Sequence, residues 1–181
     1  FLAMMIIFAF LMNKRAALII AVSLPTSIIG TFLFVKMMGF TLNFMTTMGL
    51  SLSVGILTDD AIVVIEAIFR HIQKGKTKIQ AAVDATKEVG LAVISAELSL
   101  ICVFAPTVMI QGLTGAIFKE FGITVIAAIS ISVLVSFTVA PLLSSLILKM
   151  EPKNFILFKM MDRALTWLEN SYASAAGWVL R

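Results

Sequence analysis

Charged residues are scarce in this 181-residue sequence: they make up only 13% of it, against roughly 25% in soluble globular proteins. Ala16 to Val35 contains no charged residue at all, and Gly90 to Phe118 contains only Glu97. A bilayer core of about 30 Å needs roughly 20 apolar residues in a helix, so runs of this length predict membrane spans. The scarcity of charge thus excludes a soluble globular domain.

Cysteine is also nearly absent, and the single Cys102 lies within a predicted span. This excludes an intramolecular disulfide and argues against a metal cluster. The apolar runs lack the alternation of a lipid-facing strand, so we predict helices and not a barrel. The opening apolar run, residues 1–12, has no basic segment before it and no small-residue cleavage site after it, unlike a signal peptide. Because the sequence starts inside this run, we expect it to be a piece of a longer protein.

The apolar runs predict an all-α integral membrane fold, a helical transmembrane bundle with a polar loop and an interfacial helix. Five spans, the first of them truncated, are expected at residues 1–12, 16–38, 44–69, 90–110 and 118–148. The transmembrane part is therefore 1–148, with a cytoplasmic loop at 70–89 that includes a short amphipathic helix. Gln111–Gly115 predicts a tight glycine-rich turn. Residues 149–181 carry too much charge for a span and predict an amphipathic helix at the cytoplasmic interface.

The lysine and arginine residues predict the orientation of these spans. Only Lys36 and Lys119 fall on one side of the predicted membrane. The other twelve fall on the opposite side: Lys14, Arg15, Arg70, Lys74, Lys76, Lys78, Lys87, Lys149, Lys153, Lys159, Arg163 and Arg181. Cytoplasmic segments carry an excess of basic residues. The side with twelve is therefore predicted to be cytoplasmic.

Two adjacent acidic residues, Asp59 and Asp60, lie inside the third predicted span. An ionised Asp at the centre of a span costs about 2.5–3.5 kcal/mol, whereas each Leu, Ile, Val or Phe returns only about 0.3–0.6 kcal/mol. Such residues persist where they face a bundle interior, are protonated or have a cationic partner. Neighbours on a helix diverge by about 100°, so the two carboxyl groups should flank one groove and titrate as a pair. We infer a proton-carrying site; the alternative is a pair that serves only hydrogen bonding between helices.

Small and polar residues recur every four positions before this pair. Thr47, Ser51, Gly55 and Asp59 fall on one helix face. Small residues at this spacing let a second helix approach closely, so we predict that the face is packed in a bundle interior. Glu66 lies two turns beyond, and we expect it to reach the cytoplasmic boundary; the alternative is that it lines an exit for protons.

Three further observations concern titratable residues. Glu97 is seven residues beyond Gly90, so we predict that it lies near the cytoplasmic boundary and extends to water; alternatively, it faces a water-filled gap and modifies the relay. His71 is expected to be a solvated loop histidine. Lys36 and Lys119 belong to the far turns, so a basic partner for the aspartates must come from outside this chain.

Residues 55–66 read G-I-L-T-D-D-A-I-V-V-I-E and closely resemble the signature of the resistance–nodulation–division (RND) transporters. In their hydrophobe/amphiphile efflux branch this segment reads roughly G-L-x-V-D-D-A-I-V-V-V-E-N. Further segments resemble the same family in the same order, at residues 23–32, 103–106, 112–121 and 136–141. Thr58 and Ala67 are mild departures from the pattern, and Glu97 is not part of it.

The resemblance implies that this chain corresponds to the second to sixth of twelve spans of a Gram-negative inner-membrane pump. Family members exchange protons for drugs, detergents or bile salts, work as homotrimers or close heterotrimers, and pass their cargo to a periplasmic adaptor and an outer-membrane channel. Asp59 and Asp60 match the family's proton-carrying residues, whose lysine and arginine partners lie in the second half. The resemblance implies no cofactor besides protons, no enzyme activity and no nucleic-acid partner.

Three alternatives remain open at this point. An intramembrane aspartyl protease also needs two aspartates, but its carboxyl groups must converge on one water, whereas neighbours on one helix diverge. A non-drug relative, such as a protein-translocation accessory or a lipid or metal exporter, would use the same proton step. The metal exporters tend to have alanine at the position of Asp60, which favours organic substrates. Residues 1–181 alone are expected to be inactive because half of the relay is elsewhere.

Overall fold

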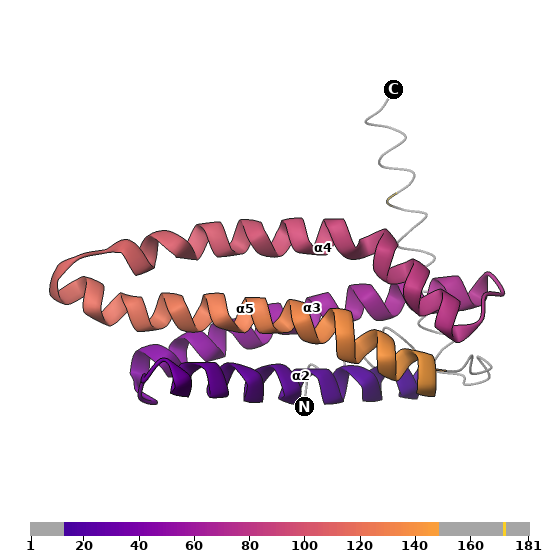
Figure 1. The fold of residues 1–181 in the computed structure, drawn as a ribbon, viewed down its shortest axis with the longest axis horizontal. Helices are drawn as coiled ribbons and strands as arrows, with labels where there is room; N and C mark the ends of the chain where they lie inside the picture. Colours follow the sequence, from indigo (N-terminus) through magenta and orange to yellow (C-terminus); the bar gives the residue numbers. More distant parts are fainter. Residues whose placement is uncertain (1–12, 149–171, 173–181) are drawn as a thin grey trace, which may run out of the picture. The chain divides into compact units, whose positions relative to one another are not determined.

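The computed structural model describes residues 13–148 and Tyr172, and the first of these ranges forms four helices. They are α2 (Lys14–Met37), α3 (Phe44–Gln73), α4 (Lys78–Met109) and α5 (Gly112–Ile147), which lie side by side (Figure 1). Both α3 and α5 contact all of the other three. The described residues contain no strand, so the predicted all-α fold is confirmed.

Local sequence signals set where these helices begin. The side chain of Asn13 accepts hydrogen bonds from the backbone of Arg15 and Ala16 at the start of α2. Asn43 and Thr46 form a reciprocal capping box at the start of α3. The side chain of Thr77 accepts a hydrogen bond from the backbone N–H of Gln80 in α4. Each cap satisfies backbone donors that a helix start leaves without intrahelical partners.

The polar segment at residues 70–89 is not a loop with a short helix of its own, as the sequence predicted. It comprises the end of α3, a turn at Lys74–Thr77 and the beginning of α4. The cap at Thr77 starts α4 twelve residues before the predicted start at Gly90. Three alanines in these first turns are buried in the core, which provides the packing that extends the helix: Ala81, Ala82 and Ala85.

The turn between α4 and α5 is tighter than predicted, because α5 already begins at Gly112. Gly112 has φ +85°, a conformation that side chains other than glycine rarely adopt. A Cβ atom on Gly115 would lie 2.0 Å from the carbonyl oxygen of Ile110. The two glycines thus allow the chain to reverse within a few residues.

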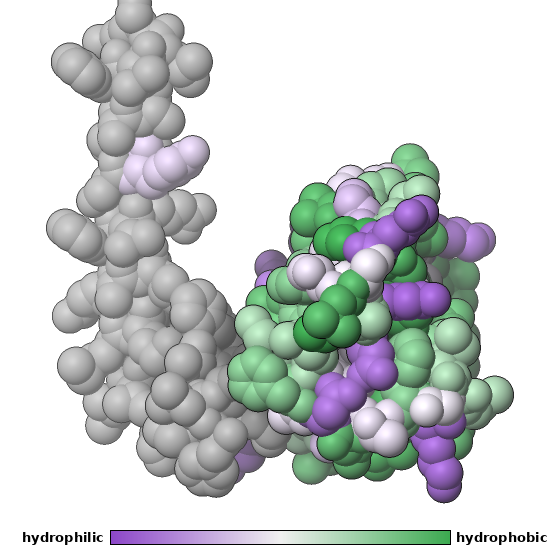
Figure 2. Space-filling view, turned by 90° about the vertical axis from the view of Figure 1, so that its left-hand side faces the viewer, coloured by the Kyte–Doolittle hydropathy of each residue, from purple (hydrophilic) through white to green (hydrophobic). Residues whose placement is uncertain are grey.

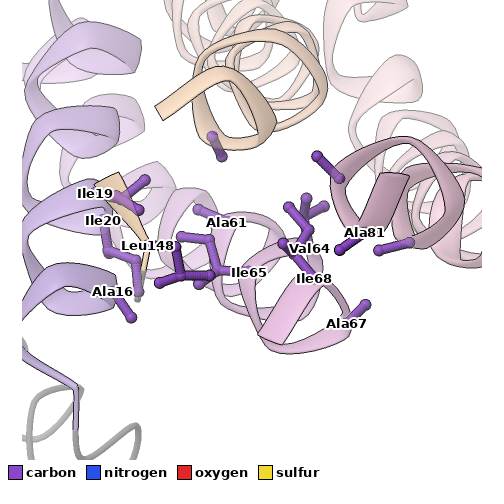
Figure 3. Packing of buried hydrophobic residues seen from close by; sticks show 13 residues of the cluster. Ala16, Ile19, Ile20, Ala61, Val64, Ile65, Ala67, Ile68, Ala81 and Leu148 are labelled. Carbon is purple, nitrogen blue, oxygen red and sulfur yellow. The ribbon is translucent and has the colours of Figure 1, made fainter. Parts of the chain in front are cut away.

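The largest apolar core lies at the end of the bundle where α2 and α4 begin and α3 and α5 finish (Figure 3). Ile19 and Ile20 of α2 and Ile65 and Ile68 of α3 are fully buried there. Leu148, directly after α5, joins the same cluster. Asp60 lies next to Ala61, which is part of this core, so the acidic site is adjacent to it.

At Gly49 the helices α3 and α5 approach each other closely. A Cβ atom added there would lie 3.2 Å from the carbonyl oxygen of Phe121 and 3.3 Å from Cβ of Thr124. Both distances are shorter than ordinary Cβ contacts. One of the two neighbours is a backbone atom, which cannot rotate away to relieve the contact. Small residues at such positions permit the close helix packing that stabilises membrane bundles.

Gly49→Ala in the full-length protein should therefore lower its thermal unfolding midpoint, although alanine favours helix formation by about 1 kcal/mol. Gly90→Ala is the matched control, because its Cβ would lie at an ordinary distance of 3.7 Å from the Phe137 ring. Gly90→Ala should leave the midpoint unchanged or raise it. Equal midpoints for the two variants would show that Gly49 does not limit the packing of α3 on α5.

Hydrogen bonds identify which helix ends lie together. Arg15 donates from Nη1 to the carbonyl oxygen of Ile147 at 3.0 Å, and Lys78 donates to the carbonyl oxygen of Leu146 at 3.4 Å. At the opposite end, the side chain of Asn43 bonds the carboxylate of Glu120. Figure 2 looks onto this opposite end, where hydrophilic residues lie among hydrophobic ones.

Cysteine labelling tests the predicted orientation. In the full-length protein in intact cells, Thr41→Cys should react with a membrane-impermeant thiol reagent, because Thr41 is exposed in the turn between α2 and α3. Lys76→Cys, in the turn at the other end, should react only after the inner membrane is permeabilised. The reverse pattern would contradict the orientation that the basic residues predict.

Three of the described helices, α2, α4 and α5, are apolar and long enough to cross a membrane. The helix α3 is not among these three: it is long enough, with 30 residues, but its acidic residues Asp59, Asp60 and Glu66 make it less apolar. That α3 is a span remains a prediction, which its length and its contacts with the other three helices support. The predicted first span, residues 1–12, and the predicted interfacial helix lie outside the described residues, except that Tyr172 is helical and exposed.

Candidate functional site

Asp59 and Asp60 lie near the middle of α3 and face different surroundings. Asp60 is turned into the bundle and is only 5% exposed, whereas Asp59 is exposed on the outer surface of the described helices. The side chains thus diverge as their helical spacing predicts. This divergence does not fit an aspartyl protease, in which two aspartates converge on one water.

Ser132 of α5 holds the buried aspartate. Its hydroxyl donates a hydrogen bond to Oδ2 of Asp60 at 2.9 Å and lies 3.4 Å from the carbonyl oxygen of Leu57. Ser132 is itself fully buried. A buried carboxyl group needs such partners because removing it from water without a hydrogen bond is costly. The bond also links α3 to α5 at the depth of the acidic pair.

Glu97 of α4 is the second buried carboxyl group at this site. It is only 6% exposed, and its side chain is within hydrogen-bonding reach of Asp60. The prediction that Glu97 lies near the boundary and extends to water is therefore wrong. The error follows from the position of α4, which begins at Lys78, so that Glu97 lies well inside the helix and not close to its start.

The approach of two carboxyl groups has a direct chemical consequence. A carboxylate has only acceptor atoms, so a hydrogen bond between Asp60 and Glu97 requires a proton on one of them. The ion pairs found among the described residues lie elsewhere, between Arg70, His71 and Glu88 and between Lys76 and Asp84. Within this part of the chain no basic side chain pairs with the acidic site. Among the described residues, a proton on one of the two acids is what would allow this hydrogen bond.

The predicted packing face of α3 is on the outside of the described bundle. Thr47, Ser51 and Gly55 are exposed together with Asp59, and a Cβ atom on Gly55 would meet nothing within 4 Å. The face that α3 buries instead is rotated from it and follows a seven-residue spacing, through Thr46, Ser53 and Asp60, with other positions between them. Glu66 is exposed on the outer side as well.

The sequence contains a signal that could have identified the α5 side of the site. Small residues recur every four positions along α5, and all of them are buried: Thr124, Ala128, Ser132, Ser136, Ala140 and Ser144. Such a stripe is typical of a closely packed helix face in a membrane. It would have placed Ser132 in the interior, opposite the aspartates.

His71 differs from its prediction as a solvated loop residue. It lies within α3, is 7% exposed and bonds Oε2 of Glu88 through Nε2 at 2.7 Å. Arg70 binds the other oxygen of the same carboxylate at 2.6 Å. These contacts fasten the end of α3 to α4 in the region predicted to be cytoplasmic. No cluster of three or more potential metal ligands occurs among the residues that the structure describes.

Comparison with known proteins shows the family to which the chain is similar. The model of the AcrB/AcrD/AcrF family matches residues 1–181. "Multidrug resistance protein MdtC" of Cronobacter sakazakii is 41% identical over 180 residues, which are 99% of this chain and 18% of that protein. The MdtC proteins of Citrobacter koseri and Escherichia coli K12 are 42% and 41% identical over the same shares. The chain thus spans about a fifth of the length of these relatives.

Proposed function

Because the chain belongs to the AcrB/AcrD/AcrF family, and so to the RND transporters that its motifs resemble, we propose that the full-length protein is a proton-driven exporter of hydrophobic or amphiphilic compounds. In this proposal the chain supplies the acidic half of the proton pathway, with Asp59 and Asp60 as proton carriers. The observation that carries it is the burial of Asp60 between Ser132 and Glu97 without a basic partner in the described residues. The name of the relatives, multidrug resistance protein, supports organic cargo.

Protonation of Asp60 would change how α3 packs against α4 and α5. A neutral Asp60 can remain between α4 and α5, because it carries no charge that needs water or a cation. A charged Asp60 keeps the Ser132 hydrogen bond but repels a charged Glu97, so it requires hydration or a basic partner. Uptake and release of a proton would thereby shift α3 relative to its neighbours, which is the kind of two-position element that transport needs.

Asp59 faces away from this interior and serves the same pathway from the other side. Its exposed face, with Thr47, Ser51 and Gly55, offers small residues at helical spacing. We place a further helix of the full-length protein on this face, with the basic partner that the resemblance implies. Asp59 and Asp60 would then lie on two sides of one helix, so that α3 transmits charge changes between the two halves of the transporter.

The remaining parts of the proposal concern the whole protein. It would reside in the inner membrane of a Gram-negative bacterium as a homotrimer or close heterotrimer. It would deliver its cargo to a periplasmic adaptor and an outer-membrane channel. Its work would be transport and not catalysis, with protons as the coupling ion and no other cofactor.

Reconstitution of the full-length protein tests the proposal. The liposomes contain a pH indicator, and a pH gradient is set across their membrane. Adding a fluorescent amphiphilic cation should start an exchange of protons for this cation, and collapsing the pH gradient should stop the exchange. Transport of the cation at the same rate without the gradient would contradict a proton-driven mechanism. No transport of the cation by a folded protein with the gradient present would contradict export of this class of compound.

A further inference from the structure

Glu97 is the buried carboxyl group that the family-like motif of residues 55–66 does not contain. It comes from α4, whereas the aspartates come from α3, and its side chain reaches across the interface to Asp60. Its Oε2 atom is buried and has no hydrogen-bond partner. An ionised carboxylate in this position would leave a charged oxygen without solvent or donor, which is among the costliest arrangements in a protein.

The groups around Glu97 leave a proton as the species that satisfies it. The charged groups that act on Glu97 are Asp60 and Asp59 of α3, both acidic. From α5, the Ser132 hydroxyl donates its hydrogen bond to Asp60 and not to Glu97. None of the basic side chains in the described part of the chain forms an ion pair with these acids. A shared proton provides the missing donor and removes one of the negative charges.

We propose that Glu97 is a third proton-carrying residue, which shares a proton with Asp60 across the interface of α3 and α4. The step is a simple exchange: the proton leaves a carboxyl oxygen of Glu97 as Asp60 gains it, and Glu97 takes on the negative charge that Asp60 loses. No other bond is made or broken. The unpartnered Oε2 of Glu97 is the atom at which a proton enters or leaves the pair. This inference rests on the proposed function and extends it to α4.

Infrared difference spectroscopy on the full-length protein in liposomes tests the assignment, because protonated carboxyl groups have a separate C=O stretching band. The band is followed from low to high pH in the wild type, Glu97→Gln and Asp60→Asn. Interacting acids titrate in separate steps that belong to the pair. Each variant should therefore lose one step, and the remaining step should move by about one pH unit or more. Glu66→Gln, which removes an exposed acid of α3, is the matched control and should leave these steps unchanged.

The two levels of the proposal fail separately. If Glu97→Gln has the same titration steps as the wild type, while Asp60→Asn loses one and stops transport, Glu97 is not a proton carrier but the proposed function stands. If Asp60→Asn still exchanges protons for the fluorescent cation, Asp60 is not a proton carrier, and the part of the proposed function that assigns it this role fails. Glu97→Asp keeps a carboxyl group and should restore a second step. If Glu97→Asp folds like the wild type but shows no second titration step, Glu97 has only a structural role.

Discussion

Replacing Asp60 by Asn should abolish proton-coupled export by the full-length protein. Asparagine has nearly the same shape as aspartic acid and can still accept a hydrogen bond from Ser132, but it cannot take up or release a proton. Loss of a group that transfers a proton slows enzymes by about a hundredfold or more, and we expect an effect of at least this size here. The measurement is the initial rate of dye-coupled proton movement in liposomes.

Asp59→Asn and Glu66→Gln complete this test on the same helix. Asp59→Asn should also abolish export, because in this proposal the exposed aspartate binds the basic partner in the other half. Glu66→Gln removes the charge of another exposed acid of α3 and should leave the rate close to that of the wild type. All three variants should assemble as the wild type does. Retained transport in both aspartate variants would refute the proton pathway.

The second large effect is expected from Ser132→Leu. Ser132 is fully buried and lies 2.9 Å from Asp60, so a leucine there has no room without separating α5 from α3. Overpacking a close-packed interior costs about 1–3 kcal/mol, and the hydrogen bond to Asp60 is lost in addition. We expect a lower unfolding midpoint and loss of export. Ser132→Ala removes only the donor and should reduce export while the midpoint falls less.

Ser130→Leu is the matched control for this substitution. Ser130 lies two residues before Ser132, which turns it about 200° around the helix from that residue. It is exposed, and its hydroxyl donates a hydrogen bond to the carbonyl oxygen of Ile126 within α5. A leucine at this position would face outward and should change neither the midpoint nor export by much. If Ser130→Leu and Ser132→Leu behave alike, the contact between α5 and Asp60 is not what the transport cycle depends on.

Features that depend only on residues close together in the sequence are predicted correctly. The long runs without charge predict helices, and within residues 13–148 the structure has helices in these places. The adjacent aspartates on one helix predict diverging carboxyl groups, which the different burial of Asp59 and Asp60 confirms. The predicted ends of the helices were less accurate, because caps such as Thr77 and core contacts such as Ala81 extend α4 beyond its apolar run.

Packing between helices was harder to predict, because it depends on which face meets which neighbour. The sequence predicts an interior face through Thr47, Ser51 and Gly55, but within the described bundle α5 packs on a face rotated from it, through Gly49 and Ser53. Both faces contain small residues, so composition does not distinguish them. The partner that would cover the first face lies outside the described residues. Only the three-dimensional arrangement shows that Asp60 faces into this bundle and Asp59 out of it.

Glu97 shows how one misplaced boundary changes the interpretation of a site. Counted from Gly90, Glu97 is predicted to lie close to the membrane surface, where acidic side chains can reach water. Counted from Lys78, where α4 begins, it lies deep in the helix. Its contact with Asp60 joins two residues that are 37 positions apart in the sequence. No local pattern in the sequence predicts such a contact.

Counting the protons that the full-length protein exchanges with solvent when it binds cargo tests the central claim most directly. A pH-indicator dye in weakly buffered solution reports this exchange as a fluorescent amphiphilic cation is added to the purified protein. The wild type should exchange protons in proportion to bound cation, and Asp60→Asn should bind the cation with no such exchange. Equal proton exchange in the two proteins would contradict the role assigned to the buried aspartate.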